Sequence, residues 1–302
     1  MFVILFEMLL LAAAVISIVY AFKTNKRSLV TLDPLIIATD HGDKNAQQRL
    51  NAERDRLKIS DEAFMQYRRS MYTRLAQNGD AFAEYQLGED ARIFWRQPRA
   101  AYDHLQRAAS MGCTEAMLKL GLLYEVGDDG FEQNLPLSFK WYMTAANAGN
   151  TEAMAKVASC YCVGYGVEES KEAAIAWATK GAKAGSAACT FALSECYKMP
   201  PSTENTKMRL QYLEQAMRMG DREIYEKAAK ELGGIFGNAY IYNFPVDSFA
   251  DRRKAAYCLS LAWFCDPDND SVREDLRKIG YQVPRQEFEQ WRADAGMLRY
   301  NP

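Results

Sequence analysis

The stretch Cys113–Gly127 reads CTEAMLKLGLLYEVG, and a close copy, NTEAMAKVASCYCVG, occupies Asn150–Gly164. In the first copy the apolar and small residues share one face of a predicted helix, at Ala116, Leu120, Gly121 and Tyr124. The second copy presents the same face through Ala153, Val157, Ala158 and Tyr161. Two such similar helices, 37 residues apart, indicate an internal repeat.

A small-residue signature ending in glycine recurs on both sides of these copies. It reads ATDHG, AQNG, AASMG, AANAG, GAKAG and AMRMG, and it ends at Gly42, Gly79, Gly112, Gly149, Gly185 and Gly220. The spacings are 37, 33, 37, 36 and 35 residues. A period this regular predicts stacked pairs of antiparallel helices, because one pair alone cannot bury its apolar face. We therefore expect an all-α fold, an α/α superhelical solenoid.

The second helix of each pair follows a glycine break. It reads LPLSFKWYMTAANAG in one copy and SKEAAIAWATKGAKAG in the next, with Trp141 and Trp177 at equivalent positions. The full pattern, A-x-x-x-L-G-x-x-Y-x-x-G followed by A-x-x-W-Y-x-x-A-A-x-x-G, resembles the Sel1-like repeats, which are related to tetratricopeptide repeats. Ala116–Gly127 with Phe139–Gly149 fits it, and Asn150–Gly185 fits nearly as well. The resemblance implies protein–protein binding and scaffolding without intrinsic activity.

The resemblance extends in weaker form over residues 32–291, which we take as the solenoid, followed by a C-terminal tail at 292–302. The segment Glu231–Phe249 departs from the period, with three glycines, several aromatic residues and Pro245. It predicts a long, structured connection between helices. Such a connection either contacts a partner or packs its aromatic side chains against the end of the solenoid.

The first 22 residues, MFVILFEMLLLAAAVISIVYAF, carry a single ionisable group, Glu7. About 20 apolar residues suffice for one transmembrane helix. A cleaved signal peptide is the alternative, but it needs a basic start and a small-residue cleavage site. We expect a transmembrane anchor at 1–22 and a basic juxtamembrane linker at 23–31.

Three basic residues, Lys23, Lys26 and Arg27, directly follow this apolar stretch. Because such residues mark the cytoplasmic side, the solenoid is expected to face the cytoplasm. The predicted location is the bacterial inner (cytoplasmic) membrane, with a single pass. Seven cysteines without framework spacing suit reduced thiols in that compartment.

Two pairs of cysteines are close enough, in sequence or in repeat position, to be tested as a metal-ligand pair or a disulfide. Cys160 and Cys162 are two residues apart, so in a helix they point to different faces and form no ligand pair. Cys160 and Cys196 are equivalent positions of neighbouring repeats. Stacked helices lie about 8–10 Å apart, whereas a disulfide needs Cα atoms within about 7 Å. We predict no bridge between this second pair.

The sequence lacks the charge excess typical of nucleic-acid binding and the common motifs of catalytic sites. Lys+Arg 37 against Asp+Glu 39 gives a net charge of −2, without the basic excess that nucleic acid requires. There is no phosphate-binding loop, GxSxG, HExxH or paired CxxC motif, and the two histidines are His41 and His104. We expect no catalytic, metal or cofactor site and no small-molecule substrate.

A binding surface should use residues that vary between repeats on the first helices. Gln86, Lys119 and Lys156 are equivalent by spacing and form one predicted polar row, with Ala192 next. We take the first three as candidate partner contacts; an ordinary solvated face is the alternative. Two roles remain open: a membrane-anchored, non-enzymatic scaffold or adaptor, and an immunity protein that neutralises a secreted effector such as a phospholipase. Some bacterial proteins that resemble Sel1-like repeat chains act as such immunity proteins.

Overall fold

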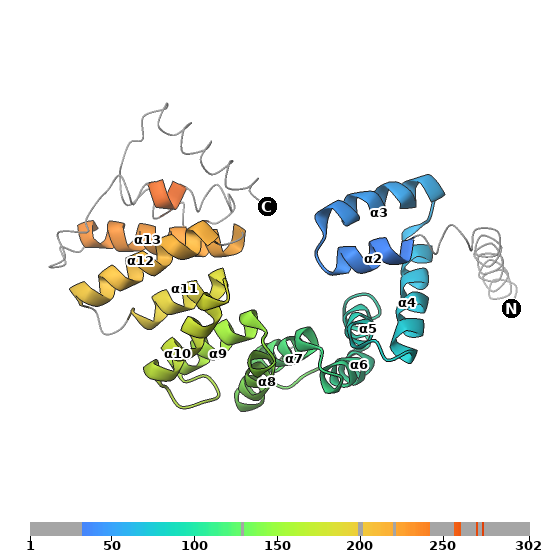
Figure 1. Cartoon of the computed structure of the whole chain (residues 1–302), viewed down its shortest axis with the longest axis horizontal. Coiled ribbons are helices and arrows are strands. Elements are labelled where there is room, and N and C mark those ends of the chain that lie inside the picture. Colours follow the sequence, from blue (N-terminus) through green and yellow to red (C-terminus); the bar gives the residue numbers. More distant parts are fainter. Residues whose placement is uncertain are drawn as a thin grey trace, which may run out of the picture. The chain divides into compact units, whose positions relative to one another are not determined.

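The computed structural model describes residues 32–127, 130–198, 202–219, 222–241, 257–260, 270 and 274. In these residues the chain forms α-helices and no strands, as predicted. The chain divides into two compact units, and the boundary lies after Met111. Unit 1 holds α2 (Asp33–Asp40), α3 (Lys44–Leu57), α4 (Asp61–Gln77), α5 (Ala81–Ile93) and α6 (Pro98–Ser110) (Figure 1). Unit 2 holds α7 (Thr114–Val126), α8 (Leu135–Asn147), α9 (Thr151–Val163), α10 (Lys171–Lys183), α11 (Ala187–Cys196), α12 (Thr203–Met219) and α13 (Arg222–Ile241).

Unit 2 is built from alternating first and second helices. The first helices, called A helices below, are α7, α9, α11 and α13; the second, or B helices, are α8, α10 and α12. Each A helix packs against the B helices beside it, and α11 also packs against α9 and α13. This stacking is the solenoid arrangement that the repeat period predicts.

The signature glycines end helices by a local mechanism. Gly42, Gly79, Gly112, Gly149 and Gly185 all have positive φ, between 86° and 98°, which favours glycine. The residue after the glycine then caps the next helix. Its side chain accepts a backbone N–H at Asp43, Asp80, Asn150 and Ser186. Gly220 lies outside the described residues.

The glycine-rich segment that begins at Glu231 is helical, so the connection predicted there is wrong for its first half. α13 continues to Ile241, and residues 242–249 lie outside the described part of the chain. A Cβ on Gly233 would collide with the side chain of Leu259, so this glycine permits close helix packing. Ala228-Ala-Lys-Glu-Leu232-Gly233 is in fact the A-x-x-x-L-G motif of a further repeat.

The repeat tyrosines, which are partly buried, each pack against a phenylalanine. Tyr124 of α7 meets Phe131, a buried residue of the loop before α8, edge-to-face at 5.3 Å between ring centroids, and Tyr161 of α9 meets Phe139 of α8 in the same way at 5.3 Å. The fully buried aromatic ring of this region is that of Tyr142. These contacts place the repeat tyrosines in the packing between a helix and its neighbouring helix or loop.

The expected membrane anchor at 1–22, the linker at 23–31 and the tail at 292–302 lie outside the described residues. None of the helices that the structure does describe has the length and apolar character needed to span a membrane.

Candidate functional site

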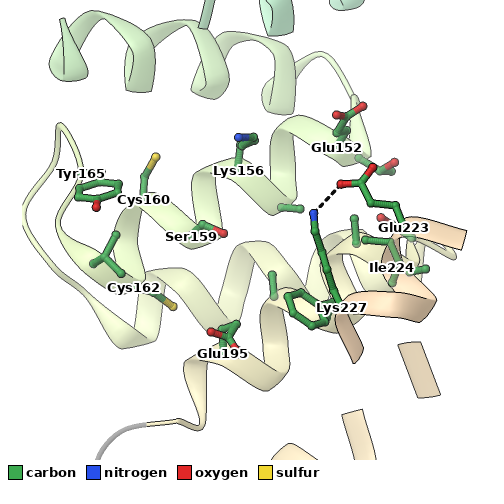
Figure 2. Close-up of a pocket in the computed structure, with 18 of the residues that line it drawn as sticks. Glu152, Lys156, Ser159, Cys160, Cys162, Tyr165, Glu195, Glu223, Ile224 and Lys227 are labelled. Atoms are coloured by element: carbon green, nitrogen blue, oxygen red, sulfur yellow. Dashed lines mark hydrogen bonds and ion pairs between the residues drawn. The ribbon is translucent and has the colours of Figure 1, made fainter. Parts of the chain in front are cut away.

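A groove of about 890 Å³ runs along the A helices of unit 2 (Figure 2). Its longest wall is one face of α9, where lining residues recur every three or four positions, at Glu152, Lys156, Ser159 and Val163. Residues of α7, α11 and α13 complete the lining. Figure 2 shows Glu223, Ile224 and Lys227 of α13 across from the α9 face.

The charged groups inside the groove are largely bound to one another. Lys156 Nζ lies 3.0 Å from Glu125 Oε2, which also accepts a hydrogen bond of 2.5 Å from the hydroxyl of Tyr142. Burial and this hydrogen bond raise the pKa of Tyr142, so its hydroxyl stays protonated. Glu223 and Lys227 form a second ion pair at 2.5 Å. Both lysines are thus held in place by carboxylates.

Glu152 differs from the other carboxylates of the groove. It lies in the first turn of α9 and is exposed, and within the described residues no cation pairs with it. Glu195, by contrast, has Lys198 at 3.5 Å and Arg209 at 3.7 Å. Of the four glutamates that line the groove, Glu152 is therefore the one whose charge is available to an incoming group.

An exposed apolar edge borders the groove at the end of α9. Val163 is 57% exposed and Tyr165 is 55% exposed, and both line the groove. Val126, 37 residues before Val163, is 67% exposed at the equivalent end of α7. Large exposed apolar side chains that recur at one edge are typical of interaction surfaces.

The structure separates the three predicted contact residues. Lys156 lines the groove. Lys119 on α7 is half-buried and is not among the residues that line it. Gln86, in unit 1, is 7% exposed and accepts a hydrogen bond of 2.7 Å from Arg68, so its predicted exposure is wrong. The reason is that α4 packs on α5 and covers the face expected to be open. The next residue of the row, Ala192, is also buried.

The repeat pattern predicted no binding role for Glu152, Val163 or Tyr165. A signal was present, because Glu152 stands one helical turn before Lys156. Val126 and Val163 also share the position before a helix-ending glycine in the two closest copies. Exposure could not be judged without knowing which neighbouring helix covers each face.

Neither histidine points to catalytic chemistry. His104 Nδ1 lies 2.7 Å from Glu84 Oε2, and Arg107 binds the same carboxylate at 3.2 Å. His41 stacks on Phe82 with 4.0 Å between ring centroids. Among the described residues, no group of histidine, cysteine and carboxylate side chains could hold a metal ion.

Comparison with known proteins identifies Sel1 repeats in this chain. The Sel1 repeat model matches residues 74–113, 114–150, 151–186 and 227–262. The last match contains the motif at Gly233. Residues 187–226 lie between matches, yet α11 and α12 continue the same helix pairing there.

One curated relative is the chitin synthase regulator SKT5 of Saccharomyces cerevisiae, which is 28% identical over 132 residues. That alignment covers 43% of this chain and 19% of the relative, so the chain spans about one fifth of that protein's length.

Two solved structures share the fold. The first is c5321, a protective antigen of uropathogenic Escherichia coli with an SLR fold (TM-score 0.62, 20% identity, 90% of this chain and 55% of that one). The second is a Sel1 repeat protein from Oxalobacter formigenes (TM-score 0.54, 19% identity, 88% and 99%). The chain therefore carries Sel1 repeats, and its described residues form an all-helical solenoid of such repeats.

Proposed function

We propose that this protein is a non-enzymatic interaction scaffold that binds a protein partner in the A-helix groove of unit 2. The observation that carries the proposal is the joint exposure of Val163, Tyr165 and Glu152 along one groove. Apolar side chains at a groove edge gain free energy when a partner removes them from water. Solenoids of helix pairs commonly bind partners along such repeated faces.

The groove also suggests the chemistry of the partner. Four glutamates and two lysines line it, and Glu152 is exposed without an internal cation. A partner segment with apolar side chains for Val163 and Tyr165, and a basic residue for Glu152, complements this surface. Lys156 remains a predicted contact. Its ion pair with Glu125 fixes it in the wall of the groove.

The proposal includes attachment to the bacterial inner membrane. It rests on the apolar stretch at 1–22 and on the basic residues Lys23, Lys26 and Arg27 after it. Reporters fused after Pro302 test the predicted topology. We expect fluorescence from a reporter that fluoresces only in the cytoplasm. Activity of a reporter enzyme that functions only outside the cytoplasm would contradict the predicted orientation of the chain.

Site-specific photocrosslinking tests the docking surface in the cell. A photoreactive amino acid replaces Val163 in the groove, and in a matched strain it replaces Lys140, an exposed residue of α8. We expect a discrete adduct with one protein from position 163 and none from position 140. Adducts that form equally at both positions, or only at 140, would contradict the proposal.

A scaffold and an immunity protein would use the same groove, so the adduct alone does not separate these roles. Deletion of the gene separates the two roles. Loss of a scaffold is expected to give a phenotype by itself, whereas loss of an immunity protein is expected to matter only when the matching toxin is active. The identity of the crosslinked partner tells which toxin to test.

A further inference from the structure

Two cysteines of neighbouring repeats meet beside the groove. The sulfur atoms of Cys162, in the last turn of α9, and Cys196, the last residue of α11, lie 3.1 Å apart. Both thiols are free. Cys162 is partly exposed and lines the groove, whereas Cys196 is 4% exposed. One member of the pair is therefore accessible and the other is protected.

This pairing differs from the one that the repeat period suggests. Cys160, the equivalent of Cys196, lies on another face of α9, and Figure 2 shows the sulfurs of Cys160 and Cys162 pointing in different directions. The two cysteines that meet are 34 residues apart rather than 36. Because α9 and α11 are packed neighbours, a small movement of the side chains brings the two sulfurs within bonding distance.

We propose that Cys162 and Cys196 form a redox-active dithiol that closes to a disulfide by exchange with a small-molecule disulfide such as oxidised glutathione. The Cys162 thiolate attacks one glutathione sulfur, which forms a mixed disulfide and releases one glutathione thiolate. The Cys196 thiol then loses its proton and attacks the Cys162 sulfur. This second step forms the Cys162–Cys196 bond and releases the second glutathione thiolate.

The environment of the two thiols sets this order of attack. A hydrogen bond from the Cys196 thiol lowers the pKa of Cys162, against the opposing effect of burial. The same contact, together with burial, raises the pKa of Cys196. The accessible cysteine is thus the better nucleophile, and the buried one resolves the mixed disulfide.

Closure would change the protein in two measurable ways. The disulfide would link α9 to α11, with α10 inside the closed loop. It would therefore lower the conformational entropy of the unfolded chain. It would also remove the Cys162 thiol from the groove lining. Neither effect requires a partner, so this inference stands independently of the proposed function.

The test uses the full chain, incubated with oxidised glutathione, alkylated to block remaining thiols, and mapped by mass spectrometry without reduction. We expect a Cys162–Cys196 cross-linked peptide as the main product. In Cys196→Ser, glutathione should remain attached to Cys162; in Cys162→Ser, Cys196 should be unmodified. Cys160→Ala serves as the matched control and should still form the bridge.

A different main disulfide in the unmodified chain, or no disulfide at all, would overturn the inference without any variant having to fold. Thermal unfolding gives a second readout. The bridged chain is expected to melt on the order of 5 °C higher than the reduced chain, and the difference should vanish after reduction. An unchanged melting temperature in a chain that is fully bridged would contradict the predicted restriction of the unfolded chain.

Discussion

Gly121 of α7 lies directly against the phenol ring of Tyr142 of α8. A Cβ at residue 121 would overlap Cε1 and Cδ1 of that ring. The backbone carbonyl of Gly121 also accepts a hydrogen bond of 2.8 Å from the hydroxyl of Ser138. The first glycine of the repeat motif therefore sets how closely the two helices of a pair approach, and it does so by the absence of a side chain.

Gly121→Ala should destabilise the protein by about 1–2 kcal/mol. Overpacking against Tyr142 costs about 1–3 kcal/mol, and the better helix propensity of alanine recovers up to about 1 kcal/mol. Urea denaturation of the purified chain measures the change. Val126→Ala, on the exposed end of the same helix, is the control and should stay within about 0.5 kcal/mol. A net stabilisation by Gly121→Ala would show that the contact is not tight.

Arg68→Met should destabilise unit 1 strongly. Arg68 binds Asp90 and Asp40, the latter at 3.0 Å, and its side chain is 10% exposed. Its removal leaves the buried carboxylate of Asp90 without a counter-charge, which costs about 3–5 kcal/mol. Arg99→Met removes an arginine that is 90% exposed and should cost less than about 1 kcal/mol. Denaturation curves that shift equally for the two variants would refute this account of the Arg68 network.

Glu84 should make stability depend on pH in the acid range. Burial opposes its ionisation, but hydrogen bonds from His104 and Arg107 outweigh burial and lower the pKa of Glu84. A lowered pKa in the folded state means that the carboxylate stabilises the fold above the unfolded-state pKa. This contribution is lost as the pH falls through the folded-state pKa.

The comparison is between the unmodified chain and Glu84→Gln, with urea denaturation at a series of pH values from neutral to acid. The variant should lose less unfolding free energy on acidification. Asp55→Asn, at an exposed carboxylate of α3, should follow the unmodified chain. Parallel pH profiles for the unmodified chain and Glu84→Gln would rule out the predicted linkage.

Tyr165→Ser should weaken partner binding while leaving the fold intact. Its side chain is 55% exposed, so little apolar burial is lost in the free protein. Truncation of an aromatic anchor in an interface commonly costs more than about 1 kcal/mol of binding, or several-fold in Kd. Melting temperature and partner affinity, measured on the same preparation, separate the two effects. A large drop in melting temperature would mean that Tyr165 is structural.

The ends of the helices and the stacking of helix pairs can be predicted from the sequence, whereas the individual contacts between neighbouring helices cannot. The signature glycines end helices because positive φ at a chain reversal is a local requirement, visible wherever glycine recurs at the repeat period. The glycine run at Gly233 predicts a loop but lies in a helix, because glycine also permits close helix packing, and only the position of Leu259 distinguishes the two uses.

The same limit explains the candidate site. Gln86 and Lys156 occupy equivalent positions, but α4 covers the first, whereas the second opens onto a groove. Cys162 and Cys196 meet although they are 34 residues apart, whereas the equivalent positions Cys160 and Cys196 are 36 apart. Exposure and pairing across repeats depend on the neighbouring helix, which the period alone does not specify.

The central claim is that a partner binds the A-helix groove and interacts with Glu152. Titration calorimetry with the crosslinked partner, applied to two charge reversals, tests this claim most directly. Glu152 and Glu172 are both exposed and both lie in the first turn of their helices, α9 and α10, so reversal to lysine perturbs each helix end alike. We predict that Glu152→Lys raises the Kd at least about tenfold and that Glu172→Lys leaves it unchanged. Equal effects of the two reversals, or an effect of Glu172→Lys alone, would contradict the claim.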